Sequence, residues 1–140
     1  MFDWKNGKVV IKGSGSTPVT WTKEVDIARY VVWTLVNLEA DKLNNAAFGV
    51  EGDRKTVREI VEEFQARTGR TLEVKHESRA EVEKRVEESR ARGEASAIMI
   101  NVLYLALDKE GVVGPKEEMN KWWPEFNPAG AVDTIIERAL

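Results

Sequence analysis

The alternation of apolar and polar residues predicts short strands at four places along the chain. A half-exposed strand alternates apolar and polar side chains, whereas a buried strand is a short apolar run. Glycine permits the positive φ angles of tight turns, so the Gly13–Ser16 segment indicates a hairpin turn between the first two strands. The predicted strands are residues 8–12, 19–22, 48–51 and 72–77.

Apolar residues at helical spacing predict five helices between and after these strands. Capping boxes, in which a Ser or Thr and a Glu three residues later satisfy each other's backbone N–H groups, open two of them at Thr56 and Ser78. Thr22 is expected to cap the first helix. Asn127 is expected to cap the last helix, with Pro128 at its first position. The predicted helices are residues 23–38, 57–69, 79–92, 94–109 and a final one from residue 128. The chain therefore reads as one α/β domain over residues 1–140, with some α+β character, in which about five helices cover a small sheet.

Composition narrows the class of protein. Apolar residues make up 42% of the chain and charged residues 32%, with both signs interspersed, as in a globular protein. The net charge of −3 and the lack of a basic patch argue against nucleic acid as a partner. The absence of cysteine excludes disulfides, thiolate metal sites and cysteine nucleophiles. The charged N-terminal segment is unlike a signal peptide, so we expect a cytoplasmic protein.

A series of local motifs resembles one known family. The segment 13–38 combines a glycine turn, a short strand ending at Thr22 and a helix with the sequence Asp-Ile-Ala-Arg. It is followed in order by AAFGVEGD near 46–53, TVREIV, TGRTLEV and WWPEFNP. Together these resemble the NmrA-like atypical short-chain dehydrogenases/reductases of the fungal NAD(P)-binding type, a Rossmann-like family.

The resemblance covers the C-terminal, substrate-binding portion of that family. It implies that the N-terminal, Rossmann-type nucleotide-binding half lies outside these 140 residues. It also implies NAD(P) as the cofactor of a full-length relative, with no cofactor bound by this chain alone. The family includes both oxidoreductases and non-catalytic members that sense the nucleotide.

The residues themselves offer no catalytic or cofactor site. The only G-x-G, at Gly13, leads into another strand instead of the helix that a dinucleotide site requires. Neither Tyr30 nor Tyr104 has a lysine four positions later, as the Tyr-x-x-x-Lys pair of many dehydrogenases would have. The sole histidine, His76, has no nucleophile nearby in sequence, and no Asp-x-Asp-x-Asp-Gly loop indicates a metal site. We therefore predict no catalytic, cofactor-binding or metal-ligating residues.

The first helix carries aromatic residues among polar ones. At 100° per residue, Tyr30 and Trp33 share a sector with polar residues that include Asp26 and Thr34. Either these aromatics line a cleft for a small apolar ligand, or they pack beneath a loop. Asp26 itself is explained by its favourable position in the first turn of a helix. The candidates for a substrate pocket are Trp21, Tyr30 and Trp33, followed by Trp122 and Trp123.

The helix at 94–109 is apolar nearly all round. Between Ala95 and Leu107 only Ser96, Asn101 and Tyr104 are polar. Thirteen residues are too few to cross a bilayer, which takes about 20 residues, so we predict no membrane span. A helix that is apolar on every side must be covered, either by a second copy in a dimer or higher oligomer or by the missing N-terminal half. The interface candidates are Ile98, Val102 and Leu105.

Two classes of function follow from these observations. In the first, the chain is the non-catalytic, substrate-binding fragment of an NmrA-like NAD(P)-dependent oxidoreductase or nucleotide-sensing protein, inactive without its cofactor half. In the second, it is a stand-alone interaction or assembly module that self-associates through an apolar helix. A small cofactor-independent enzyme is a third reading, but the sequence shows no acid, base or nucleophile for it.

Overall fold

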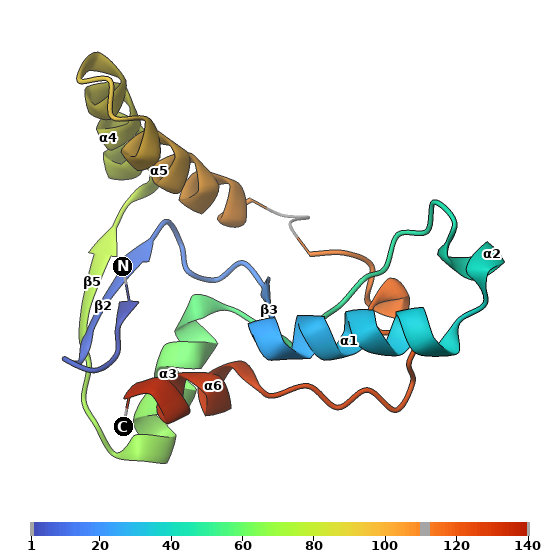
Figure 1. Cartoon of the computed structure of the whole chain (residues 1–140). Coiled ribbons are helices and arrows are strands. Elements are labelled where there is room, and N and C mark those ends of the chain that lie inside the picture. Colours follow the sequence, from blue (N-terminus) through green and yellow to red (C-terminus); the bar gives the residue numbers. More distant parts are fainter. Residues whose placement is uncertain (1, 110–112, 140) are drawn as a thin grey trace.

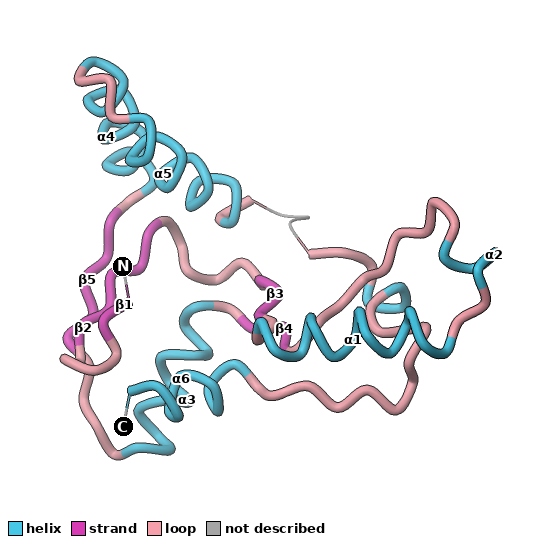
Figure 2. Tube along the Cα trace, in the orientation of Figure 1, coloured by secondary structure: helices cyan, strands magenta, loops and turns pink. Residues whose placement is uncertain are grey.

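Two small sheets carry the short strands (Figures 1 and 2). The structure is a computed structural model that describes residues 2–109 and 113–139. Its strands are β1 (Phe2–Asp3), β2 (Lys8–Lys12), β3 (Val19–Trp21), β4 (Asp53–Lys55) and β5 (Glu73–Glu77). The first sheet has the order β1-β2-β5, with β1 antiparallel and β5 parallel to β2. The second sheet is the antiparallel pair β3-β4.

Six α-helices lie within the described ranges. They are α1 (Glu24–Asn37), α2 (Ala40–Leu43), α3 (Val57–Thr68), α4 (Arg79–Ala91), α5 (Ala95–Leu107) and α6 (Ala131–Ala139). Both predicted capping boxes form, because the hydroxyls of Thr56 and Ser78 accept the backbone N–H of Glu59 and Glu81, whose carboxylates accept in return. The mixed α/β class and the small sheet of short strands are confirmed.

The main apolar core lies between β2, α3 and α6. Val9 and Ile11 of β2 are both buried because alternate residues of a strand point to the same side. Helices α3 and α6 lie close together in Figure 1, and their buried residues pack in one cluster with those of β2. The buried residues of this cluster are Val9, Ile11, Ile60, Val61, Phe64, Leu72, Ala131 and Val132.

Helices α4 and α5 form a hairpin that stands away from the rest of the chain (Figure 1). Gly93, with φ of 69°, lies in the turn between them. Val82 and Val86 of α4 are buried, whereas Asn101 is the one buried residue of α5. No helix among residues 2–109 and 113–139 has the length and apolar character needed to cross a bilayer.

The predicted hairpin turn at Gly13–Ser16 is wrong. β2 and β3 do not pair with each other and belong to different sheets. The turn instead ends β2 and carries the chain across to the second sheet. Periodicity and glycine content locate a turn, but the choice of strand partner depends on β5 and β4, which lie far along the sequence.

The predicted strand at 48–51 is also wrong, apart from one isolated bridge between Gly49 and Met119. A side chain takes the place of a strand partner there. Asn120 Oδ1 accepts the N–H of Glu51 at 3.0 Å, and its Nδ2 donates to the Glu51 carbonyl at 2.7 Å. The strand begins later, at Asp53.

Two predicted helix caps are wrong because residues distant in sequence supply the contacts. The Thr22 hydroxyl accepts the N–H of Gly52 at 3.2 Å, and Lys23 occupies the N-cap of α1 without a side-chain capping hydrogen bond. The last helix begins at Ala131 instead of Pro128. Its first N–H is accepted by Asp53 of β4 at 3.1 Å.

Candidate functional site

Helix α1 buries its polar stripe. Asp26, Tyr30 and Thr34, spaced four residues apart, are only 2%, 1% and 4% exposed. They face the loop that precedes α6. The Tyr30 ring meets Phe126 edge-on, with centroids 5.1 Å apart, and lies 6.2 Å from Trp123. Tyr30 therefore packs beneath a loop, the second of the two alternatives that the sequence left open.

The Asp26 carboxylate fastens this loop to α1. Its Oδ2 accepts the backbone N–H of Ala129 at 2.9 Å, and its Oδ1 accepts from Arg29 Nη1 at 2.6 Å. Position at the start of a helix does not account for such burial and long-range bonding. Asp26 is thus part of a buried network that the sequence did not indicate.

Trp33 and Trp123 line an open groove of about 490 Å³ along α1. Their rings are stacked, with centroids 5.0 Å apart and planes 5° from parallel. Arg29 lies at the same groove, with its guanidinium 6.0 Å from the Trp123 ring. Trp122 packs edge-on against Phe48 instead, with centroids 5.8 Å apart.

Trp21 lies in a different place from these aromatics. Its Nε1 donates to the Lys55 carbonyl at 2.9 Å, and its ring meets Phe2, which in turn stacks on Trp4 at 5.5 Å. The three rings line a cavity of about 210 Å³ that Arg138 also borders. Of the predicted pocket residues, Trp21 therefore lies at this cavity and Trp33 and Trp123 at the α1 groove, whereas Tyr30 and Trp122 line neither of the two.

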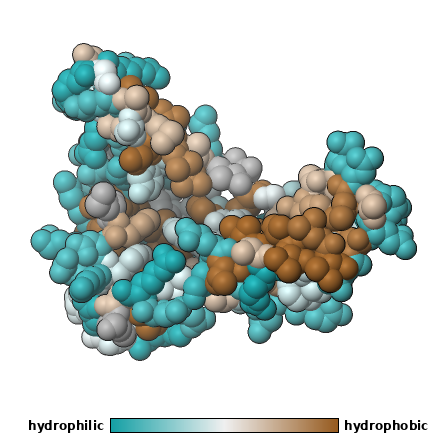
Figure 3. Space-filling view, viewed as in Figure 1, coloured by the Kyte–Doolittle hydropathy of each residue, from teal (hydrophilic) through white to brown (hydrophobic). Residues whose placement is uncertain are grey.

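The outward side of α1 is apolar. Six of its aliphatic side chains are between 43% and 75% exposed, and they form much of the hydrophobic surface in Figure 3. These residues, which we call the α1 face, are Val25, Ile27, Val31, Val32, Leu35 and Val36. Sequence reasoning found the amphipathic pattern of this helix but did not see that its polar side points inward.

Of the interface candidates on α5, Val102 is exposed, whereas Ile98 and Leu105 are half-buried. Other outward side chains of α5 are Met99, Ile100 and Leu103. Contacts with α4 and with β2 cover part of α5 and leave the side chains of Met99, Ile100, Val102 and Leu103 exposed.

The glycine turn after β2 is occupied by one of the chain's own carboxylates. Gly13 and Gly15 have φ of 78° and 64°, and both the N–H and the hydroxyl of Ser14 donate to Asp108 Oδ1 at 2.8 Å. A Cβ on Gly13 would lie 2.3 Å from the Asp108 carboxyl carbon. This turn therefore joins β2 to the end of α5.

Lys12 of β2 also contacts α5. Its ammonium donates to Asn101 Oδ1 at 2.9 Å and lies 4.3 Å from the centroid of the Tyr104 ring. Desolvation by burial lowers the pKa of Lys12. Because the ammonium sits over the ring, this is a cation–π contact. It joins the hairpin to the first sheet.

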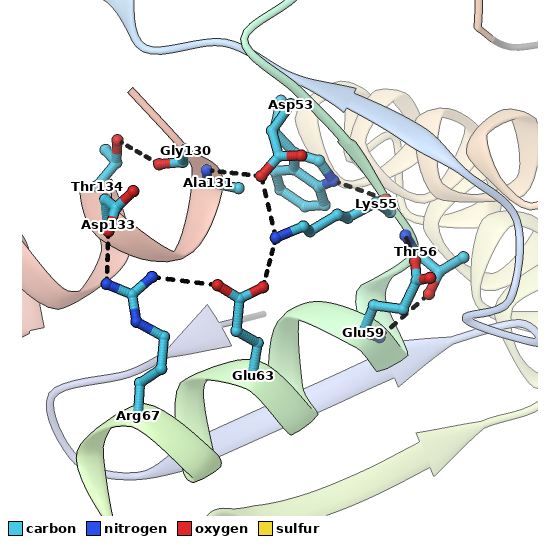
Figure 4. A network of polar contacts seen from close by, with 11 residues as sticks. Asp53, Lys55, Thr56, Glu59, Glu63, Arg67, Gly130, Ala131, Asp133 and Thr134 are labelled. Carbon is cyan, nitrogen blue, oxygen red and sulfur yellow. Dashed lines mark hydrogen bonds and ion pairs between the residues drawn. The ribbon is translucent and has the colours of Figure 1, made fainter. Parts of the chain in front are cut away.

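A chain of ion pairs joins β4, α3 and α6 (Figure 4). Lys55 pairs with Asp53 at 3.3 Å and with Glu63, and Arg67 joins Glu63 at 3.1 Å to Asp133 at 2.6 Å. The hydrogen bond with Glu63 raises the pKa of Lys55, and the same bond lowers the pKa of Glu63. These charges satisfy one another, so the network is structural. Among the described residues no group of His, Cys, Asp and Glu could hold a metal ion.

Comparisons with known proteins place the fold. No protein-family model matches the chain, and no curated protein matches it significantly. Among solved structures, the triphenylmethane reductase of Citrobacter sp., complexed with NADP(H), matches with a TM-score of 0.67 at 16% identity. The match covers 98% of this chain and 46% of the reductase. The chain thus has the fold of part of an NADP-binding reductase and spans about half of its length.

Proposed function

We propose that this chain is the substrate-binding, C-terminal portion of an NmrA-like NAD(P)-dependent oxidoreductase or nucleotide-sensing protein. The match of nearly the whole chain to 46% of an NADP-binding reductase carries this proposal. On its own the chain binds no nucleotide and is inactive. A nucleotide-binding half, joined to it or added to it, would supply NAD(P).

The glycine turn after β2 supports the proposal that this chain does not itself bind the nucleotide. A dinucleotide site needs free backbone N–H groups at a turn that opens a helix, where they meet the pyrophosphate. At the only G-x-G of the chain, the Ser14 N–H is taken by Asp108 and the chain continues into β3. These groups are therefore committed to holding the fold together.

The cavity beside Trp21 suits the substrate side of such a protein. Phe2, Trp4 and Trp21 give it flat apolar walls. Its charged edge is formed by Lys23, Glu24 and Arg138. Pockets for small molecules are lined mainly by apolar and aromatic side chains with a few polar groups. At about 210 Å³ it is smaller than a typical complete pocket, so we expect the absent half to complete it.

Calorimetric titration of NADPH and NADH into the purified chain tests the proposal. We expect no heat of binding, while the NADP(H)-binding Citrobacter reductase serves as a positive control in the same buffer. Micromolar binding to this chain would contradict the proposal, because it would require a complete nucleotide site within these residues.

A second candidate function is self-assembly through an apolar helix. The α1 face favours it, since contiguous exposed apolar surface on a protein marks an interaction site. Under this proposal the chain acts as an interaction module, and its oligomeric state is the property to measure.

A further inference from the structure

We infer that the α1 face is a self-association surface, on which a second copy of this chain packs its own α1 in parallel. The inference rests on the assembly alternative and is independent of the reductase proposal. It also moves the contact away from α5, where the sequence had placed it.

The outward residues of α1 have the spacing of a coiled-coil seam. Val25, Ala28, Val32 and Leu35 follow each other at intervals of three, four and three residues, which is the spacing of positions a and d in a heptad. Val32 and Leu35 are 60% and 63% exposed. Two such helices can insert each other's side chains into the spaces between their own.

The charges beside the seam specify its direction. Glu24 precedes the first seam residue, and Arg29 follows the second, so they occupy positions g and e. In a parallel pair, position g of one helix lies beside position e of the other, five residues later. Glu24 of each copy then meets Arg29 of the other.

The Arg29 guanidinium can pair with Asp26 of its own chain and with Glu24 of the other copy at the same time. Its side chain is 49% exposed and one of its five donors binds Asp26. An antiparallel pair would instead set Glu24 against the apolar flank of the other helix. The parallel arrangement is the one in which these charges pair.

The chain exposes more surface than a globular monomer of its mass, by an amount that one protein–protein interface could bury. The accessible surface is 8890 Å². A globular monomer of 15.8 kDa is expected to expose about 7,300 Å², so the excess is about 1,600 Å². A standard interface buries about 800 Å² on each partner. One such interface therefore fits within the excess.

Helix α5 is the weaker candidate for a specific pairing. Between Ala95 and Leu107 it has no charged residue, so nothing in it selects a direction or a register. The α1 face also adjoins the groove lined by Trp33 and Trp123, which can accept side chains from a second helix.

Light scattering after gel filtration tests the inference with two matched substitutions. At tens of micromolar we expect twice the 15.8 kDa chain mass for the unaltered protein and for Val102→Asp on α5. We expect one chain mass for Val32→Asp, with the circular dichroism spectrum unchanged because both side chains are exposed. A monomeric unaltered protein, or dissociation by Val102→Asp alone, would overturn the inference.

Disulfide trapping tests the direction of packing without relying on a disruptive variant. The chain contains no cysteine, so Val25→Cys introduces a single thiol at the seam. In a parallel pair the two thiols are adjacent, and we expect oxidation to give a covalent dimer, whereas Ala80→Cys, at an exposed position of α4, gives none. Equal trapping by both variants, or none at Val25→Cys, would contradict parallel packing. Nucleotide binding would count against the reductase proposal alone. A monomeric mass would count against both the assembly function and this inference, and a dimer that dissociates with Val102→Asp but not with Val32→Asp would count against this inference alone.

Discussion

The Asp26 carboxylate joins α1 to the segment that leads into α6, and its replacement perturbs that junction directly. It is 2% exposed, it accepts the Ala129 N–H and it pairs with Arg29. Asp26→Ala removes both bonds and leaves a part-buried backbone N–H without its acceptor. Asp26→Asn keeps an amide oxygen that can accept one of them but removes the charge.

The magnitude follows from the two contacts. An unsatisfied buried donor costs about 1–3 kcal/mol. The pair with the half-exposed Arg29 contributes at most about 1 kcal/mol, because solvent screens it. We therefore expect Asp26→Ala to lower the free energy of unfolding by about 1–4 kcal/mol, and Asp26→Asn by about 1–2 kcal/mol. Helix-start electrostatics alone would give about 0.3–1 kcal/mol.

Urea unfolding, followed by circular dichroism at one chain concentration, measures these differences. Concentration must be fixed because association changes the apparent stability of the folded chain. Asp41→Asn is the matched control, since Asp41 is an exposed aspartate in the first turn of α2. If Asp26→Asn costs no more than Asp41→Asn, the carboxylate acts only on the helix dipole and the buried junction is refuted.

Two further predictions concern single contacts. The hydrogen bonds from Arg85 lower the pKa of Glu77 below its ordinary 4.5, so its contribution to stability is present above that pH and is lost as pH falls toward the lowered value. Glu77→Gln should therefore flatten the decline in unfolding free energy below about pH 4.5 in urea titrations; an unchanged slope would contradict this. Gly13→Ala should cost more than the roughly 1–3 kcal/mol of backbone strain, because its Cβ also meets Asp108. Gly93→Ala is the control, because Gly93 has a similar φ and open space around it. Equal losses of unfolding free energy for the two variants in urea titrations would exclude the Asp108 contact.

Elements whose determinants are local were predictable from the sequence. The starts of α3 and α4 are correct because Thr56 and Ser78 find their partners three residues later. The predicted start of the last helix and the predicted strand at 48–51 are wrong. The first depends on a hydrogen bond to Asp53 and the second on hydrogen bonds to Asn120, and each partner lies about 70 or more residues away in sequence. No window of neighbouring residues contains that information.

The orientation of α1 shows the same limit for the candidate site. Periodicity gives two faces of a helix, and the usual expectation is that the apolar one points inward. Here Asp26 and Thr34 point inward, because the Ala129 N–H and the aromatic loop around Phe126 receive that side. The sequence singled out five aromatic residues as pocket candidates. Only the structure shows that Trp21 lies at one cavity, and Trp33 and Trp123 at the α1 groove.

The parallel pairing of β2 with β5 has a consequence for how the chain reaches its native state. Val9 pairs with Val74, about 65 residues later, so the first sheet closes a long loop before its contacts stabilise anything. Chains dominated by such distant contacts fold slowly. During synthesis β2 must wait until β5 has left the ribosome, and all of α1 emerges in the meantime. The apolar side chains of α1 are therefore available to chaperones before the first sheet has formed.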